Sequence, residues 1–124
     1  MRTPHQSLRL FHILVVEDHD DRRDILEQIL RHAGASVTAV ANARDALLMA
    51  GVVDAIVTDL AMPDADGRWL LAQIEARQYR VPVIAVTGYA EHYHDLLGAR
   101  FTRVLKKPVD PDRLVAELLD VIRR

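Results

Sequence analysis

The sequence predicts an α/β fold, a doubly wound parallel sheet of five strands with helices on both faces. Two observations lead to this prediction: short strand-like runs alternate strictly with helical patterns, and three of the runs contain continuous apolar stretches. Strands that are apolar on both sides are typical of parallel sheets covered by helices. Strict alternation further predicts right-handed crossovers between parallel strands. The pattern repeats five times, which predicts a (βα)5 arrangement.

Five short runs rich in valine and isoleucine are the predicted strands. They span residues His12–Glu17, Ser36–Val40, Ala55–Thr58, Val81–Val86 and Arg103–Lys106. The first, third and fourth runs are apolar without interruption over several residues, which predicts central strands buried on both faces. The second run is more mixed in character, as expected of a strand at the edge of the sheet.

Apolar residues recur at three- and four-residue spacing between the strands, the pattern of amphipathic helices. The clearest stripes lie within Ile25–Ala33, Ala46–Ala50, Leu70–Ile74 and Leu114–Ile122. Asp66 is expected to cap the third helix, and Asp110, followed by Pro111, suits the start of the fifth. The fourth helix, around Ala90–Leu97, has room for only about two turns, so we expect it to be mobile or displaced.

Length and composition limit the possible functions. At 124 residues the chain has the size of one domain; residues 1–11 are predicted to be a tail or linker and residues 12–124 the domain. A net charge of −2 with dispersed basic residues argues against direct nucleic-acid binding. The lack of cysteine excludes a disulfide framework and a thiolate metal site. Neither a signal peptide nor a membrane span is recognisable, so no membrane association and a cytoplasmic location are expected.

Polar residues gather where the predicted strands end. The first strand ends in Glu17 and Asp18, the third in Asp59, the fourth in Thr87 and the fifth in Lys107. Ligands of open parallel sheets bind beyond these carboxyl ends, so three carboxylates, a hydroxyl and an ammonium group are expected along one edge. Each residue alone is more often a turn or capping residue. The combination, from four strands, is specific.

This combination predicts phosphoryl transfer assisted by Mg²⁺. Carboxylates held close together repel one another, and a hard cation that prefers oxygen ligands relieves the repulsion. Asp59 can bind the metal through one oxygen and attack phosphorus with the other, which gives an aspartyl phosphate. Lys107 and the metal can neutralise phosphoryl oxygens, and the Thr87 hydroxyl can donate a hydrogen bond to another.

Four motifs in the chain resemble the response-regulator receiver domain of two-component signalling, which has a flavodoxin-like fold. The resemblance runs from about His12 to Ile122. It rests on the segments Val15–Asp18, Asp59–Gly67, Val86–Tyr89 and Lys107–Pro108. The second segment reads D-x-x-M-P-x-x-D-G and is highly specific. The resemblance implies a strand order of 2-1-3-4-5.

The resemblance also implies an acceptor and a set of metal ligands. Asp59 would be the phospho-acceptor, phosphorylated from a histidine kinase or a histidine phosphotransfer protein. Asp18, Asp59 and the backbone carbonyl of Ala61 would bind Mg²⁺ directly, with Glu17 acting through water. Ala61 offers no side chain to orient an attacking water molecule, so slow hydrolysis of the phosphorylated form is expected.

Further roles follow from the same resemblance. Thr87 would be the switch hydroxyl, and Lys107 the ammonium that pairs with the phosphoryl group. The peptide bond before Pro108 would be cis, a state that proline tolerates better than other residues. Val104 stands where the family usually has Tyr or Phe, and belongs with Tyr89 to the switch and partner face. Tyr89 could also shield the phosphoryl group.

Three classes of function remain to be compared. The first is a phosphorylated receiver that catalyses its own phosphorylation and slow autodephosphorylation, so it is not a turnover enzyme. The second is a protein-binding module of the same fold that works without phosphorylation, which Val104 makes worth considering. The third, a Mg²⁺-dependent phosphatase or hydrolase, is disfavoured because no segment for a substrate pocket is recognisable. Output is expected through an unidentified downstream protein or through sequence outside this chain, with the domain a monomer or weak homodimer.

Overall fold

The structure is a computed structural model that describes residues 7–60, 62, 66–88 and 100–123. Within these residues five strands form one sheet: β1 (His12–Val16), β2 (Ser36–Val40), β3 (Ala55–Asp59), β4 (Val83–Thr87) and β5 (Arg103–Lys106). Neighbouring strands all pair in parallel, in the order β2-β1-β3-β4-β5. The predicted parallel sheet and the strand order implied by the family resemblance are therefore confirmed.

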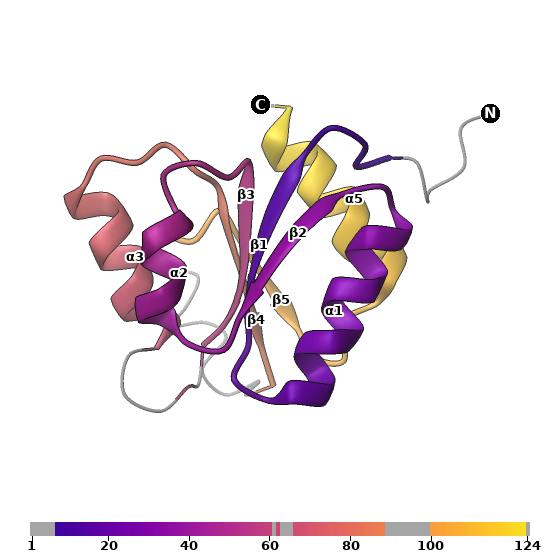
Figure 1. Ribbon diagram of the computed structural model, residues 1–124, viewed down its shortest axis with the longest axis horizontal. Helices are drawn as coiled ribbons and strands as arrows, with labels where there is room; N and C mark the ends of the chain where they lie inside the picture. Colours follow the sequence, from indigo (N-terminus) through magenta and orange to yellow (C-terminus); the bar gives the residue numbers. More distant parts are fainter. Residues whose placement is uncertain (1–6, 61, 63–65, 89–99, 124) are drawn as a thin grey trace.

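Helices cover both faces of the sheet. The described helices are α1 (Asp20–His32), α2 (Ala43–Met49), α3 (Gly67–Ala76) and α5 (Pro111–Ile122). Figure 1 shows α1 and α5 on one side of the sheet and α2 and α3 on the other, and an apolar core cluster lies on each side. None of these described helices is long and apolar enough to cross a membrane. The predicted fourth helix, around Ala90–Leu97, lies outside the described residues.

Side-chain caps set the starts of the helices. Each cap accepts a hydrogen bond from the backbone N–H three residues on; the caps are His19, Asn42, Asp66 and Asp110. A cap of this kind satisfies one of the N–H groups that a helix leaves unpaired at its start. The predicted caps Asp66 and Asp110 are confirmed, and Pro111 occupies the first position of α5. The caps let the helices begin close beyond the strand ends.

The inner strands extend to the polar residues at their ends. β4 starts at Val83 rather than at the predicted Val81, because Pro82 has no N–H to donate to a neighbouring strand. β3 continues through Asp59 and β4 through Thr87, and the two strands are neighbours. These two side chains are therefore positioned by the pairing of the sheet itself.

Part of the predicted N-terminal tail packs on the domain. Leu8 is fully buried, and its N–H donates a hydrogen bond to the carbonyl of Ala33, just after α1 (N to O 2.7 Å). Leu8 belongs to the same core cluster as Leu118 of α5. Leu8 therefore contributes to the core, with Phe11 partly buried against it, while the start of the domain at residue 12 stays a prediction.

Candidate functional site

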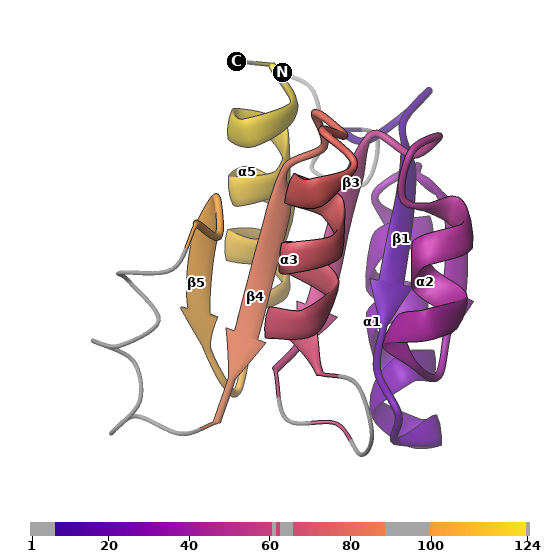
Figure 2. The same cartoon turned by 90° about the vertical axis from the view of Figure 1, so that its left-hand side faces the viewer.

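The candidate site lies at the edge where the parallel strands end. Figure 2 shows β1, β4 and β5 pointing in the same direction, so their carboxyl ends reach the same edge of the sheet. The pairing register sets Asp59 of β3 beside Val86 of β4, and Thr87 of β4 beside Lys106 of β5. The polar residues that follow each strand consequently meet at this edge, which we call the acidic edge.

Three carboxylates come together at the acidic edge. Glu17, Asp18 and Asp59 each offer an oxygen, and these oxygens all lie within 4.8 Å of one another. Glu17 and Asp59 are buried, at 1% and 6% exposure, whereas Asp18 is partly exposed. Two buried carboxylates beside a third are costly unless cations or hydrogen-bond donors compensate them.

Lys107 supplies a cation between the two buried carboxylates. Its Nζ lies 3.2 Å from Oδ1 of Asp59 and 3.5 Å from Oε1 of Glu17. The backbone N–H of Lys107 donates to the carbonyl of Thr87 (2.7 Å), which ties this segment to the end of β4. The Lys107–Pro108 peptide bond is cis, and Thr87 is buried at 2% exposure. The sequence-predicted acceptor, hydroxyl and ammonium residues are thus brought together.

Local packing and hydrogen bonds hold the Asp59 backbone and side chain. Oδ1 of Asp59 accepts the N–H of Leu60 (2.8 Å), and the Thr58 hydroxyl donates to the Asp59 carbonyl (2.8 Å). A Cβ atom on Gly67 would lie 2.8 Å from that carbonyl oxygen. Only glycine therefore allows α3 to start this close to β3, which gives the glycine of the D-x-x-M-P-x-x-D-G motif a steric reason.

Glu17 has more partners than the sequence suggested. Oε2 accepts the backbone N–H of His19 (3.0 Å), and Oε1 lies 3.3 Å from Nε of Arg22 as well as near Lys107. Arg22 was not a predicted site residue. The signal that could have found it is its place in the first turn of α1, directly after the acidic pair.

The predicted switch and partner residues lie partly outside the described residues. Ala61 and Tyr89 fall there, so the structure does not place them. Val104 of β5 is described and is buried in the core on the α2 and α3 side of the sheet. Its neighbour Arg103 points toward α5, where it contacts Glu117 and Asp120.

An apolar pocket adjoins the acidic edge on the α1 side. It has a volume of about 410 Å³, and Glu17, Arg22 and Lys107 line it together with apolar residues. The apolar lining comprises Ile25, Leu26, Ile29, Val86, Pro108 and Val109. Ile25 is 56% exposed although it is a large apolar residue. We call this cavity the α1 pocket; sequence reasoning did not predict it.

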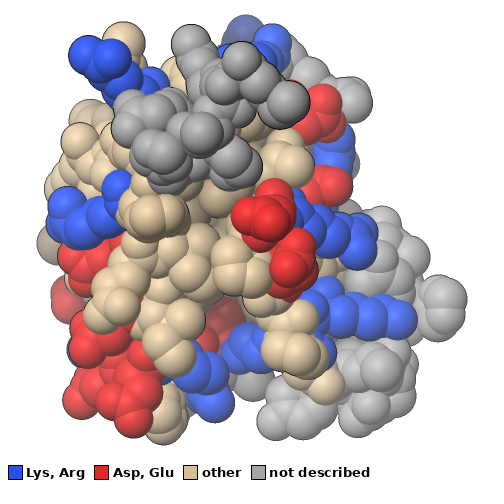
Figure 3. Space-filling model, turned by 90° about the vertical axis from the view of Figure 1, so that its right-hand side faces the viewer, with Lys and Arg blue, Asp and Glu red and all other residues tan. Residues whose placement is uncertain are grey.

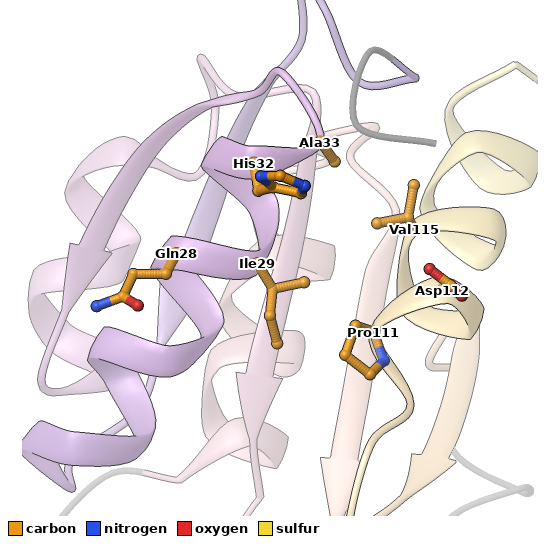
Figure 4. A pocket seen from close by; sticks show the side chains of 7 residues that line it. All are labelled: Gln28, Ile29, His32, Ala33, Pro111, Asp112 and Val115. Carbon is orange, nitrogen blue, oxygen red and sulfur yellow. The ribbon is translucent and has the colours of Figure 1, made fainter. Parts of the chain in front are cut away.

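A second pocket of about 390 Å³ lies further along α1, between that helix and α5. Figure 4 shows Gln28, Ile29 and His32 of α1 opposite Pro111 and Val115 of α5, and Ile29 lines both pockets. In Figure 3 the same side of the molecule carries a red acidic patch and, beside it, a band of uncharged surface. The first turn of α1 contributes two acidic residues, Asp20 and Asp21. The α1–α5 side thus combines apolar grooves with charge.

Sequence comparison identifies the family. The profile of the response regulator receiver domain matches residues 13–119. The chain belongs to this family. Receiver domains are signalling modules of two-component systems, and the fold and the cluster of acidic residues described above agree with that membership.

Similar proteins include one solved receiver domain with a metal. The receiver domain of a sensor histidine kinase from Pseudomonas aeruginosa superposes with a TM-score of 0.84 at 32% identity, covering 92% of this chain and 98% of that one. That structure has a magnesium ion coordinated in its active-site cleft.

Two curated relatives differ in length. An uncharacterised 14.6 kDa protein of Leptolyngbya boryana is 39% identical over 116 residues, which cover 89% of this chain and 88% of the relative. The response regulator SaeR of Staphylococcus aureus is 26% identical over 118 residues, covering 91% of this chain. The match spans only 51% of SaeR, about half of its length.

Proposed function

We propose that this receiver domain accepts a phosphoryl group on Asp59, with Mg²⁺, from a phosphorylated histidine of a kinase or phosphotransfer protein. The observation that carries the proposal is the position of Lys107 Nζ, 3.2 Å from Oδ1 of Asp59, beside three convergent carboxylates. An ammonium group beside a carboxylate is where a phosphoryl group bound to that carboxylate would need a counter-charge.

The donor set at the acidic edge fits a hard divalent cation. Glu17, Asp18 and Asp59 offer carboxylate oxygens within 4.8 Å of one another, and Mg²⁺ prefers such oxygen ligands. We assign Asp18 and Asp59 as direct ligands and Glu17 as a ligand through water, together with the carbonyl of Ala61 outside the described residues. A bound Mg²⁺ supplies the positive charge that a phosphoryl group needs beside three carboxylates.

The residues of the chain would carry out the transfer as follows. An oxygen of Asp59 forms the new bond to phosphorus as the phosphorus–nitrogen bond of the donor breaks. The imidazole leaves with the electron pair and takes up a proton from water. Lys107 pairs with one phosphoryl oxygen, and the Thr87 hydroxyl donates a hydrogen bond to another. Positioning and charge neutralisation provide most of the catalysis in such transfers.

The domain acts as an acceptor and not as a turnover enzyme in this proposal. It works in the cytoplasm and receives its phosphoryl group from a protein partner, without contact to nucleic acid or membrane. Slow autodephosphorylation, with Tyr89 shielding the phosphoryl group, returns it to the resting state. The domain is a monomer or weak homodimer that passes its state to a downstream protein.

One observation favours a second candidate function. Val104 has no ring and no hydroxyl, and it is buried in the core, so it cannot report the state of Thr87 in the way that the aromatic residue usual in the family does. A receiver fold that binds a protein partner without phosphorylation is therefore the alternative. The two candidates differ in whether Asp59 takes up a phosphoryl group.

The test is phosphorylation in solution. The protein is incubated with Mg²⁺ and acetyl phosphate or phosphoramidate, and its intact mass is compared with that of Asp59→Asn. We expect a gain of one phosphoryl group that requires Mg²⁺ and is absent in the variant. A lack of any gain, with these donors and with phosphorylated histidine proteins, would favour the phosphorylation-independent binding module.

A further inference from the structure

Arg22 contacts the acidic edge, although the proposed phosphoryl transfer assigns it no role. Its Nε lies 3.3 Å from Oε1 of Glu17. The Arg22 side chain is 52% exposed, whereas that of Glu17 is 1% exposed. A carboxylate buried to this degree loses its hydration and needs nearby cations or hydrogen-bond donors to compensate its charge. Arg22 is one of the groups that meet this need.

The same oxygen of Glu17 has a second cation beside it. Lys107 Nζ is 3.5 Å from Oε1 of Glu17 and 3.2 Å from Oδ1 of Asp59. Glu17 is thus shared by two cations, and Lys107 is shared by two carboxylates. Because both cations face one oxygen, the strength with which Arg22 holds Glu17 affects how strongly Glu17 attracts Lys107.

We propose that Arg22 is a positioning residue that neutralises Glu17 and so keeps Lys107 available to Asp59 and its phosphoryl group. This inference rests on the proposed function and adds a residue to it. The positive charge of Arg22 also opposes cation binding at the neighbouring carboxylates. Arg22 therefore weakens Mg²⁺ binding while it favours phosphoryl transfer.

Loss of Arg22 should change Mg²⁺ affinity and phosphorylation rate in opposite directions, a result that a purely structural role of Arg22 would not produce. Without Arg22, the acidic edge becomes more negative and binds Mg²⁺ more tightly. At the same time Glu17 draws Lys107 away from Asp59, so phosphorylation at saturating Mg²⁺ becomes slower. A residue that only stabilised the start of α1 would, when removed, weaken both processes or neither.

The neighbouring arginine provides a matched control. Arg23 lies in the same turn and carries the same charge, but its Nη2 contacts Asp20 (2.7 Å), and its Nη1 donates to the backbone carbonyl of Glu17 (3.1 Å) rather than to the carboxylate. Arg22→Met and Arg23→Met therefore change the net charge equally. They differ in whether the Glu17 carboxylate loses a partner.

The experiment measures two quantities for the wild type, Arg22→Met, Arg23→Met and Arg22→Lys. Calorimetric titration with Mg²⁺ alone gives the dissociation constant, and intact mass gives the rate of phosphorylation by phosphoramidate at saturating Mg²⁺. For Arg22→Met we expect Mg²⁺ to bind about threefold to tenfold more tightly and phosphorylation to be several-fold slower. Arg23→Met should stay within about twofold of the wild type in both, because its partner Asp20 is exposed and screened.

Arg22→Lys tests whether the positive charge at this position suffices or whether the shape of the guanidinium group is required. The contact runs from one nitrogen of Arg22, Nε, to Oε1 of Glu17. Arg22→Lys therefore keeps a cation near Oε1 and should restore both quantities toward wild-type values. Equal changes in Arg22→Met and Arg23→Met, or a joint loss of Mg²⁺ affinity and rate in Arg22→Met, would overturn the inference alone. A wild-type protein that binds no Mg²⁺ and gains no phosphoryl group would overturn the proposed function, and the inference with it.

Discussion

On the α1 side of the acidic edge, charged groups border an open apolar pocket. On the β5 side, by which we mean the side formed by Arg103 and Val104, the side chains are buried or held in ion pairs. The α1 side holds Arg22 and Lys107 beside the α1 pocket, with the apolar side chain of Ile25 more than half exposed. On the β5 side, Val104 is buried in the core, and Arg103 is bound to two carboxylates of α5.

This difference suggests a division of labour around Asp59. An apolar surface with charges at its border, directly beside the proposed acceptor Asp59, suits the approach of a protein that delivers a phosphoryl group. In the described part of the β5 side, Val104 is buried and the charge of Arg103 is paired, so neither residue offers much contact surface to a protein partner. We therefore expect substitutions on the α1 side to affect transfer, and substitutions on the β5 side to affect mainly stability.

The largest effect is expected for Ile25→Glu on the α1 side. A carboxylate at the rim of the α1 pocket would lose its hydration against an apolar surface of the partner protein and would repel acidic residues of that protein. At the centre of an interface such a change weakens the binding free energy by about 2 kcal/mol or more. Phosphotransfer from a phosphorylated histidine protein should therefore become about 30-fold slower. Phosphorylation by acetyl phosphate should stay within about twofold of the wild type, because Ile25 contacts none of the acidic-edge residues by hydrogen bond or ion pair.

A matched control for this variant lies on the opposite face. Leu48 of α2 is also a large, exposed apolar residue, at 83% exposure, and Leu48→Glu adds the same charge. Leu48→Glu should leave the rates of phosphorylation by the histidine protein and by acetyl phosphate unchanged. Two results would contradict the special role of the α1 side. The first is that Leu48→Glu slows transfer from the histidine protein as much as Ile25→Glu does. The second is that Ile25→Glu slows phosphorylation by acetyl phosphate as much as it slows transfer from the protein.

On the β5 side, Val104→Ala should lower the stability of the fold and leave the rate of phosphorylation unchanged. Removing two buried methyl groups should lower the free energy of unfolding by about 1.5 kcal/mol, measured by urea denaturation. Val52→Ala removes the same groups at 75% exposure and should change it by less than about 0.5 kcal/mol. Phosphorylation of Val104→Ala by acetyl phosphate should stay within about twofold of the wild type. A tenfold loss of rate would show that the β5 side is coupled to Asp59 after all.

The placement of the main site residues could be predicted from sequence because parallel strands share one carboxyl edge. The alternation of strands and helices predicted the sheet. Asp59 ends β3 and Lys107 directly follows β5, so their proximity did not depend on side-chain detail. The caps Asp66 and Asp110 could be predicted for a similar reason, since the interaction is local and spans three residues.

The contacts around Glu17 could not be predicted in the same way. Arg22 reaches Glu17 across the junction of a loop and a helix, and its direction depends on where His19 starts α1. The α1 pocket likewise requires three separate segments, around Ile25, Val86 and Pro108, to come together. The burial of Val104 depends on which face of β5 it occupies, so its departure from the family pattern was visible in the sequence but its packing was not.

The smallest effect is expected for Arg103→Met, which tests whether the β5 side is held by packing or by charge. Nε of Arg103 lies 3.0 Å from Glu117 and Nη2 lies 2.5 Å from Asp120, with exposures of 26% and 49% for the two carboxylates. Because water and salt screen partly exposed pairs, losing them should lower the free energy of unfolding by only about 0.5–1 kcal/mol. The loss should shrink at about 1 M NaCl, where the Debye length is about 3 Å. Urea denaturation at low and high salt measures both values.

Arg31→Met on the α1 side is the matched control for Arg103→Met. Arg31 pairs with Glu27 one helical turn away (2.9 Å) and is 53% exposed, so its removal should cost about 0.3–0.5 kcal/mol for the pair. Its Nη2 also donates to the carbonyl of Val37 (2.9 Å), which salt should affect less than the ion pair. A loss above about 2 kcal/mol for Arg103→Met that salt does not reduce would contradict the screened-pair interpretation. The ion pairs to α5 would then belong to the buried framework of the β5 side, and charge as well as packing would close that side.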